Sequence, residues 1–190
     1  AVGLLFLFVV WEMTVDEPVL NLSLFKSNKF RNANIAAFLA VLSMSSITLL
    51  MPFYLQNVRH FSIIRVGLTM TAIPLTMFVF APIAGRLSDS YSTRLLTALG
   101  IGVLTFSLCL LSFLSISSTQ EPWVIVLNLC FVGMGFGLFQ SPNSKVILSD
   151  VSHENLGMAS ALLATVRNLG IVTGTALSSM LLMVYYSKHG

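Results

Sequence analysis

Residues 32–58 read NANIAAFLAVLSMSSITLLMPFYLQNV, and this run contains no Asp, Glu, Lys or Arg. A helix that crosses a hydrocarbon core of about 30 Å needs about 20 residues at roughly 1.5 Å each. Four further uncharged runs reach that length, between Arg65 and Arg86, Arg94 and Glu121, Glu121 and Lys145, and Arg167 and Lys188. The sequence therefore predicts an all-α integral membrane protein with five complete transmembrane helices.

The composition excludes the main classes of water-soluble protein. Of 190 residues, 56% are hydrophobic and only 9% are charged, against about a quarter charged in an ordinary soluble domain. Ten basic and seven acidic residues give a net charge of +3. This is not the basic surface of a nucleic-acid-binding protein, and the hydrophobicity is too high for a disordered chain. We expect the lipid bilayer as the surrounding partner and no nucleic acid.

The positions of the charges divide the chain into segments. We expect residues 1–11 to be the end of a preceding transmembrane helix and residues 12–33 to be a cytoplasmic linker. The five predicted spans cover residues 34–55, 66–85, 95–116, 122–144 and 157–187. Because the connections are short, consecutive spans are expected to be antiparallel neighbours. Basic residues are more frequent on the linker side, at Lys26, Lys29, Arg31, Arg86, Arg94 and Lys145, which makes that side cytoplasmic by the positive-inside rule.

Seven residues in the spans are candidates for lining a substrate pathway. Polar side chains within a bilayer usually face a neighbouring helix or a wet cavity, and Met and aromatic side chains suit soft apolar pockets. Hydrogen bonding between helices remains an equally open interpretation of the amides. Arg167 either lies at the membrane boundary, where it can reach water, or is buried and needs a partner. The candidates are Met51, Tyr54, Asn128, Gln140, Asn143, Arg167 and Asn168.

Glycines recur at four-residue spacing in the last two spans. Gly133 and Gly137 lie in the fourth span, and Gly170 and Gly174 lie in the fifth. Such stripes allow two helix backbones to approach closely. They fit either static packing or a pair of helices that rock during transport.

The chain shows no pattern typical of an enzyme. His60, His153 and His189 lie in the predicted loops or near the last residue, without metal-ligand spacing and without a nucleophile motif. We therefore expect no catalytic residues, no metal and no cofactor.

Residues 85–94 read GRLSDSYSTR, which resembles the G-x-x-x-D-x-x-x-R loop of the major facilitator superfamily. In that family the loop joins the second and third helices of a half on the cytoplasmic face. Gly85 would allow close helix approach, Asp89 could accept from helix N-terminal amides, and Arg86 and Arg94 could pair across the loop. Ser92 stands where the fuller family pattern has a second glycine. The resemblance implies a conformational role for Gly85, Arg86, Asp89 and Arg94.

Further segments resemble the fourteen-helix drug:proton antiporter group of that superfamily, over nearly the whole chain. They are PVLNLSLF at 18–25, PFYLQ at 52–56, GLTMTAIP at 67–74, APIAGR at 81–86, GMAS at 157–160, TVRNLG at 165–170 and GTA at 174–176. The resemblance implies an incomplete C-terminal six-helix half, in which residues 34–187 supply five helices and the last helix is absent. It also implies an N-terminal transporter half as partner, which would carry the proton-coupling carboxylates.

This resemblance implies a proton-coupled efflux antiporter for hydrophobic or amphipathic organic compounds, working by alternating access in the plasma membrane of a prokaryote. The substrate would be a small amphipathic molecule. One alternative is an exporter of a single endogenous metabolite or siderophore. Another is a non-transporting membrane fragment or assembly partner, and proton-coupled uptake by the isolated chain would contradict that interpretation.

Overall fold

The computed structural model describes residue 24 and residues 26–116 and 121–189. The helices are α2 (Asn28–Phe53), the π-helix η2 (Tyr54–Val58), α3 (Ile63–Met70), α4 (Ala72–Ser90), α5 (Thr93–Ile116), α6 (Pro122–Ser149), the 3₁₀ turn η3 (His153–Asn155) and α7 (Leu156–His189). The helix end expected over residues 1–11, and most of the expected linker, lie outside the described residues.

Five helical segments of the described chain are long and apolar enough to cross a membrane, which confirms the predicted all-α membrane fold. They are Asn28–Val58, Ile63–Ser90, Thr93–Phe113, Pro122–Ser149 and His153–Tyr185. Large apolar side chains cover their outer surface, for example Phe78 with 80% of its surface exposed and Phe106 with 63%. In water this exposure would be costly, whereas in lipid it is expected.

The helices extend beyond several of the predicted bounds. The first helix begins at Asn28 rather than at residue 34, because the Ser27 hydroxyl caps it by accepting from the Phe30 amide at 3.4 Å. The second and fourth spans continue to Ser90 and Ser149, past the predicted residues 85 and 144. Charge-free runs locate the part of a helix that lies in hydrocarbon, and backbone hydrogen bonding continues past it into polar residues.

The first two spans each contain one irregularity. The second span is divided at Thr71, where α3 gives way to α4, because Pro74 has no N–H to donate to the carbonyl four residues earlier. The first span changes to a π-helix at Tyr54, two residues after Pro52. The Arg59 amide there donates to the Tyr54 carbonyl at 3.2 Å, which keeps the backbone of this wider turn hydrogen-bonded.

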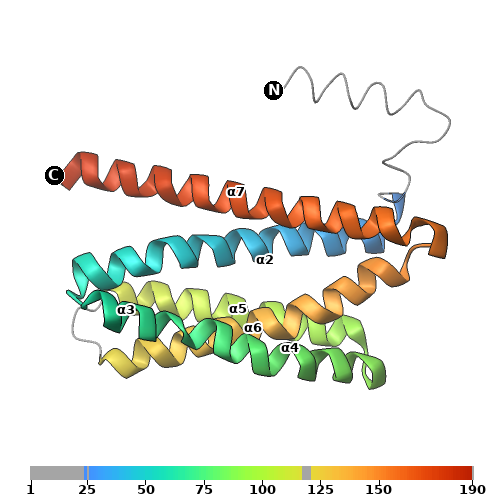
Figure 1. The fold of residues 1–190 in the computed structure, drawn as a ribbon, viewed down its shortest axis with the longest axis horizontal. Coiled ribbons are helices and arrows are strands. Elements are labelled where there is room, and N and C mark those ends of the chain that lie inside the picture. The colour runs from blue at the N-terminus through green and yellow to red at the C-terminus, as the bar shows by residue number, and fades with distance from the viewer. Residues whose placement is uncertain (1–23, 25, 117–120, 190) are drawn as a thin grey trace, which may run out of the picture.

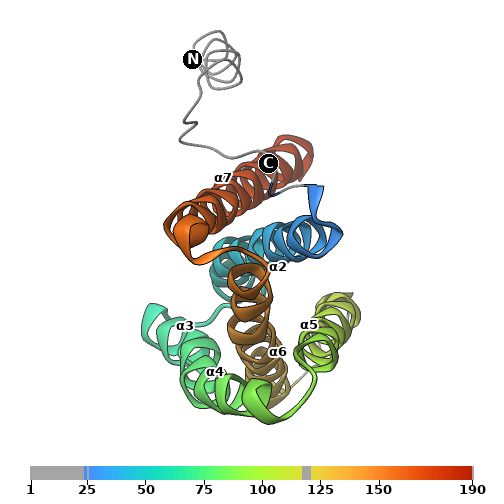
Figure 2. The same cartoon turned by 90° about the vertical axis from the view of Figure 1, so that its right-hand side faces the viewer.

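The helices form two layers, as Figures 1 and 2 show. One layer holds α2 and α7, which run parallel to each other in close contact. In the other layer α6 lies between α4 and α5 (Figure 2). The prediction that consecutive spans are neighbours holds for α5 and α6. It is wrong for α4 and α5, which α6 largely separates, and α2 with α4 and α6 with α7 also make little contact. The start of α2, the end of α4, the end of α6 and the start of α7 lie at one end of the bundle (Figure 1). Asp89 is near the end of α4, and we call this end of the bundle the Asp89 end.

Glycines explain how the helices approach so closely within each layer. A Cβ atom at Gly133 would overlap the Ile73 carbonyl oxygen of α4, and one at Gly137 would lie 3.2 Å from the Ala81 nitrogen. A Cβ at Gly174 of α7 would lie 2.5 Å from the Leu42 carbonyl oxygen of α2. Each of these helix pairs is thus in backbone contact at its glycines, as the four-residue spacing predicts.

Gly170 extends the α2–α7 contact by one turn, since its Cβ would lie 2.9 Å from the Phe38 carbonyl oxygen. Two further glycines hold α5 against α6 and were missed in the sequence. A Cβ at Gly100 would lie 2.5 Å from the Phe139 nitrogen, and one at Gly135 would lie 2.6 Å from the Leu104 nitrogen. The two glycines belong to different helices and lie opposite each other, so neither sequence segment alone shows the four-residue pattern.

Candidate functional site

A groove of about 470 Å³ opens between α2, α6 and α7. Most of its wall is apolar, with Val41, Met44 and Leu49 from α2, Phe136 from α6 and Ile171 from α7. The hydroxyls of Ser45, Thr48 and Thr175 also line the groove, but each donates to a carbonyl of its own helix. The groove therefore offers an apolar surface with few polar groups available to a ligand, which is typical of small-molecule sites.

Gln140 and Arg167 supply the groove with an amide and a positive charge. Arg167 lies about 16 Å along α7 from its start at Leu156, as the rise per residue gives. Its Nη2 donates to the Ser144 hydroxyl of α6 at 2.8 Å. The structure thus has Arg167 partly buried with a partner on another helix, and this partner directly precedes Lys145, the charged residue that ends the uncharged run of α6.

Met51 and Tyr54 lie apart from this groove. They line a second groove of about 460 Å³ between α2 and α5, with Leu108 and Leu111 on its far side. Met51 is buried in the main apolar core, and Tyr54 packs against that core. These two candidates are therefore not brought together with Gln140 and Arg167.

The other three amides have separate surroundings. The Asn143 side chain is buried, and its Nδ2 donates to the Ala33 carbonyl of α2 at 3.1 Å, as expected for hydrogen bonding between helices. Asn128 is buried, and neither polar atom of its side chain has a hydrogen-bond partner among the described residues. Asn168 is exposed on α7. The structure thus groups Gln140 with Arg167 and leaves the remaining pathway candidates elsewhere.

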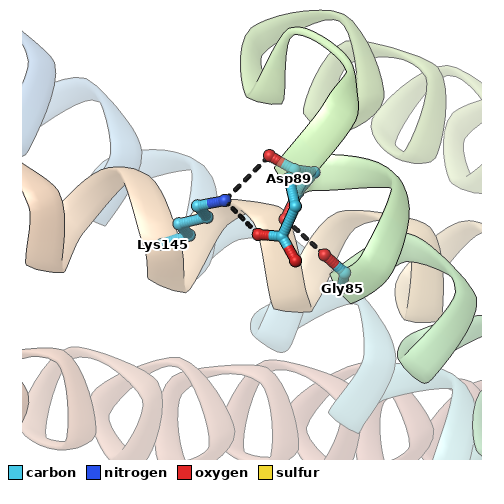
Figure 3. A network of polar contacts seen from close by, with 4 residues as sticks. Gly85, Asp89 and Lys145 are labelled. Carbon is cyan, nitrogen blue, oxygen red and sulfur yellow. Dashed lines mark hydrogen bonds and ion pairs between the residues drawn. The ribbon is translucent and has the colours of Figure 1, made fainter.

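A second polar arrangement lies at the Asp89 end (Figure 3). Lys145 of α6 reaches the end of α4, where its Nζ donates to Asp89 Oδ1 at 2.5 Å and to the Ser88 carbonyl at 2.8 Å. Gly85 lies one turn earlier, and a Cβ there would be 3.1 Å from Ser141 Oγ of α6. The loop is therefore fastened to α6 by both a charge pair and close packing.

This arrangement corrects the expected chemistry of the loop. The sequence allows Asp89 to accept from helix amides and Arg86 and Arg94 to pair across the loop. In the described part of the chain the ion pair at this loop is instead that of Asp89 with Lys145, and Arg86 and Arg94 are exposed. The sequence analysis did not predict Lys145 as the partner of Asp89. A signal was present, because Lys145 ends an uncharged run on the side of the membrane where Asp89 was also predicted to lie.

The Asp89 end holds one further contact between distant segments. The Ser27 hydroxyl that caps α2 also hydrogen-bonds Asp150, which follows α6. Around it lies a small buried cluster that includes Phe30 of α2, Ile147 of α6 and Leu162 of α7. Three helices from the two layers are therefore joined at this end.

Comparison with known proteins agrees with the resemblance seen in the sequence. Residues 2–184 match the family described as Major Facilitator Superfamily. The chain is 33% identical over 173 residues to "Riboflavin transporter RibZ" of Clostridioides difficile (strain 630), covering 91% of this chain and 38% of that protein. It is 28% identical over 185 residues to "Multidrug export protein EmrB" of Haemophilus influenzae, covering 95% of this chain and 35% of that protein.

"Probable multidrug resistance protein EmrY" of Escherichia coli (strain K12) is similar at 29% identity over 177 residues, which are 91% of this chain and 34% of that protein. The chain thus spans little more than a third of the length of these curated relatives, and its five membrane-length helices form part of the family fold. The family consists of transporters rather than enzymes. On the match over nearly its whole length, this multi-pass membrane chain belongs to the major facilitator superfamily.

Proposed function

We propose that the chain is the C-terminal part of a proton-coupled efflux antiporter for hydrophobic or amphipathic organic compounds. In this proposal the α2–α6–α7 groove forms one wall of the substrate pathway. An N-terminal half supplies the opposite wall and the proton-coupling carboxylates. The Asp89 end faces the cytoplasm of a prokaryotic cell, in agreement with the excess of basic residues on that side.

The observation that carries the proposal is the character of the groove. Its volume of about 470 Å³ falls within the roughly 300–1,000 Å³ typical of sites for drug-sized ligands. Met44 and Phe136 give a polarisable wall that adapts to different apolar shapes. Few lining groups fix a ligand's orientation, and such a surface favours a range of amphipathic compounds. Two relatives are named for multidrug export and multidrug resistance, and these names also support transport of a range of compounds.

The packing suggests how the groove could change its access. Close glycine contacts tie α4 to α6 and α2 to α7, so each pair is expected to move as a unit. Asp89 and Lys145 join α4 to α6 at the proposed cytoplasmic side. In an alternating-access cycle the Gly85–Arg94 loop, held against α6 by this pair, would contact the N-terminal half when that side is closed, and the groove would then face outward.

A second candidate is transport of one specific compound. It is favoured by the relative named as a riboflavin transporter, which is 33% identical over 91% of this chain. A planar aromatic ring system could lie against Phe136 in the same groove. Competition between unrelated substrates separates the two candidates, because a selective transporter binds one of them alone.

An accumulation assay tests the proposed function. Cells that lack their major efflux pumps and express the transporter containing this chain should accumulate several-fold less of the neutral dye N-phenyl-1-naphthylamine than control cells. A protonophore should abolish the difference. Thr175→Trp fills the groove and should restore dye accumulation, whereas Met180→Trp should not, since Met180 is 65% exposed and does not line the groove.

Two results would count against multidrug efflux. Equal accumulation with and without the transporter would contradict export of the dye. Riboflavin transport that the dye leaves unaffected, together with no export of the dye, would favour the single-compound candidate instead.

A further inference from the structure

Arg167 places a positive charge in a largely apolar groove between α2, α6 and α7. About 16 Å of helix separates it from the start of α7, and the other lining residues of the groove are neutral. A charge against an apolar wall is costly unless it has a partner or water. The location of Arg167 therefore calls for an explanation beyond helix packing.

The partners of Arg167 within the chain satisfy only part of its hydrogen-bonding capacity. A guanidinium group carries five N–H donors and a full charge. Among the described residues it makes one hydrogen bond, to the neutral Ser144 hydroxyl. The ion pair found in the described residues is that of Asp89 and Lys145, so no carboxylate of this part of the chain neutralises Arg167. Its side chain nevertheless lines the groove, where a ligand can reach it.

The rest of the groove indicates what such a ligand looks like. Gln140 can add one amide hydrogen bond beside Arg167, while Val41, Leu49 and Ile171 provide apolar contact. The planar fork of an arginine pairs with carboxylate, sulfonate or phosphate groups through two parallel hydrogen bonds. A complementary ligand therefore has one anionic head and an apolar body.

We propose that the α2–α6–α7 groove binds amphipathic organic anions, with Arg167 pairing with the anionic head and the apolar wall holding the body. This inference rests on the proposed function and narrows its substrate class. It assigns Arg167 a binding role, with Ser144 as a positioning residue that holds the guanidinium against α6.

Two dyes that share one skeleton test the inference. 8-Anilinonaphthalene-1-sulfonate carries a sulfonate, and N-phenyl-1-naphthylamine is the same ring system without it. Binding is measured by dye fluorescence with the purified transporter in phosphatidylcholine nanodiscs, after subtraction of empty nanodiscs. The wild-type protein should bind the sulfonate more tightly. Arg167→Gln should weaken sulfonate binding by about tenfold or more, the expected loss of a charge-assisted contact, and change binding of the neutral dye less than about twofold.

Three variants serve as controls. Arg167→Lys keeps the charge and should retain most of the sulfonate affinity. Lys29→Gln removes the same unit of charge from an exposed position at the Asp89 end and should bind both dyes like the wild type. Arg167→Met removes the charge with a side chain that membrane helices accept, and it replaces Arg167→Gln if that variant is not monodisperse after purification.

Different failures have different meanings. Equal weakening of both dyes by Arg167→Gln, or no preference for the sulfonate in the wild type, would overturn the anion site while leaving the proposed efflux function standing. Absence of binding by either dye would overturn both. Displacement of the sulfonate by phosphatidylglycerol in the nanodiscs, dependent on Arg167, would assign the site to an anionic lipid and also overturn the inference.

Discussion

Replacing Gly133 with alanine is expected to destabilise the folded protein by about 3 kcal/mol, the upper part of the range for overpacking. The added methyl group would overlap the Ile73 carbonyl oxygen and Thr76 Oγ1 of α4. The Thr76 side chain can rotate, but the Ile73 carbonyl is fixed by its helix, so α4 and α6 would have to separate. Because α6 lies between α4 and α5, the whole layer would be disturbed.

Gly102→Ala is the matched control for this prediction. Gly102 lies in α5, and a Cβ there would have nothing within 4 Å. The same glycine-to-alanine change should therefore leave stability unchanged or raise it, by up to about 1 kcal/mol, through better helix propensity. Thermal unfolding of the purified proteins in one detergent measures both variants. Similar midpoints for Gly133→Ala and Gly102→Ala would show that α4 and α6 are not in backbone contact at Gly133.

The second large effect is expected from the Asp89–Lys145 pair. Asp89→Asn should shift the equilibrium between the two access states by about five- to thirtyfold, equivalent to roughly 1–2 kcal/mol. An exposed ion pair alone contributes less than this, and here the side chains of Lys145 and Asp89 are 44% and 73% exposed. The Lys145 ammonium group also donates to the Ser88 carbonyl. Without the Asp89 carboxylate to hold Lys145 in place, this second hydrogen bond is expected to weaken as well.

Cysteine accessibility measures the shift. A cysteine at Gln140, in a background with Cys109 and Cys130 replaced by serine, should react faster with an impermeant maleimide applied from the cytoplasmic side once Asp89→Asn is added. Glu154→Gln is the matched control, because it makes the same acid-to-amide change at an exposed position of the same end. Unchanged labelling and unchanged efflux in Asp89→Asn would remove the proposed role of the loop.

The sequence predicted the spans well because lipid exposure acts directly on composition. A helix surrounded by hydrocarbon cannot carry charges along most of its length, so the uncharged runs locate every membrane-length helix of the described chain. The helix ends were less predictable. The Ser27 cap at one end of α2 and the π-helix at the other depend on single hydrogen bonds that charge spacing does not register.

The candidate site was predictable only in part, because sequence does not say which face of a helix meets which neighbour. Gln140 and Asn143 are three residues apart on α6, yet Gln140 lines the groove and Asn143 bonds α2. Likewise Arg167 reaches Ser144 while the adjacent Asn168 is exposed. These differences arise from the two-layer packing and from glycines that face each other on neighbouring helices, such as Gly100 and Gly135. Both features depend on how two helices pack together, which the sequence of one helix does not show.

The arrangement of the five helices across lipid is tested most directly by spin-label accessibility in reconstituted bilayers. Labels at Phe78 and Phe106, which are 80% and 63% exposed on the outer surface, should collide readily with oxygen and rarely with a water-soluble nickel complex. A label at Arg94, exposed at the Asp89 end, should show the reverse. Ready access of the nickel complex to Phe78 and Phe106 would contradict a bundle that spans the membrane.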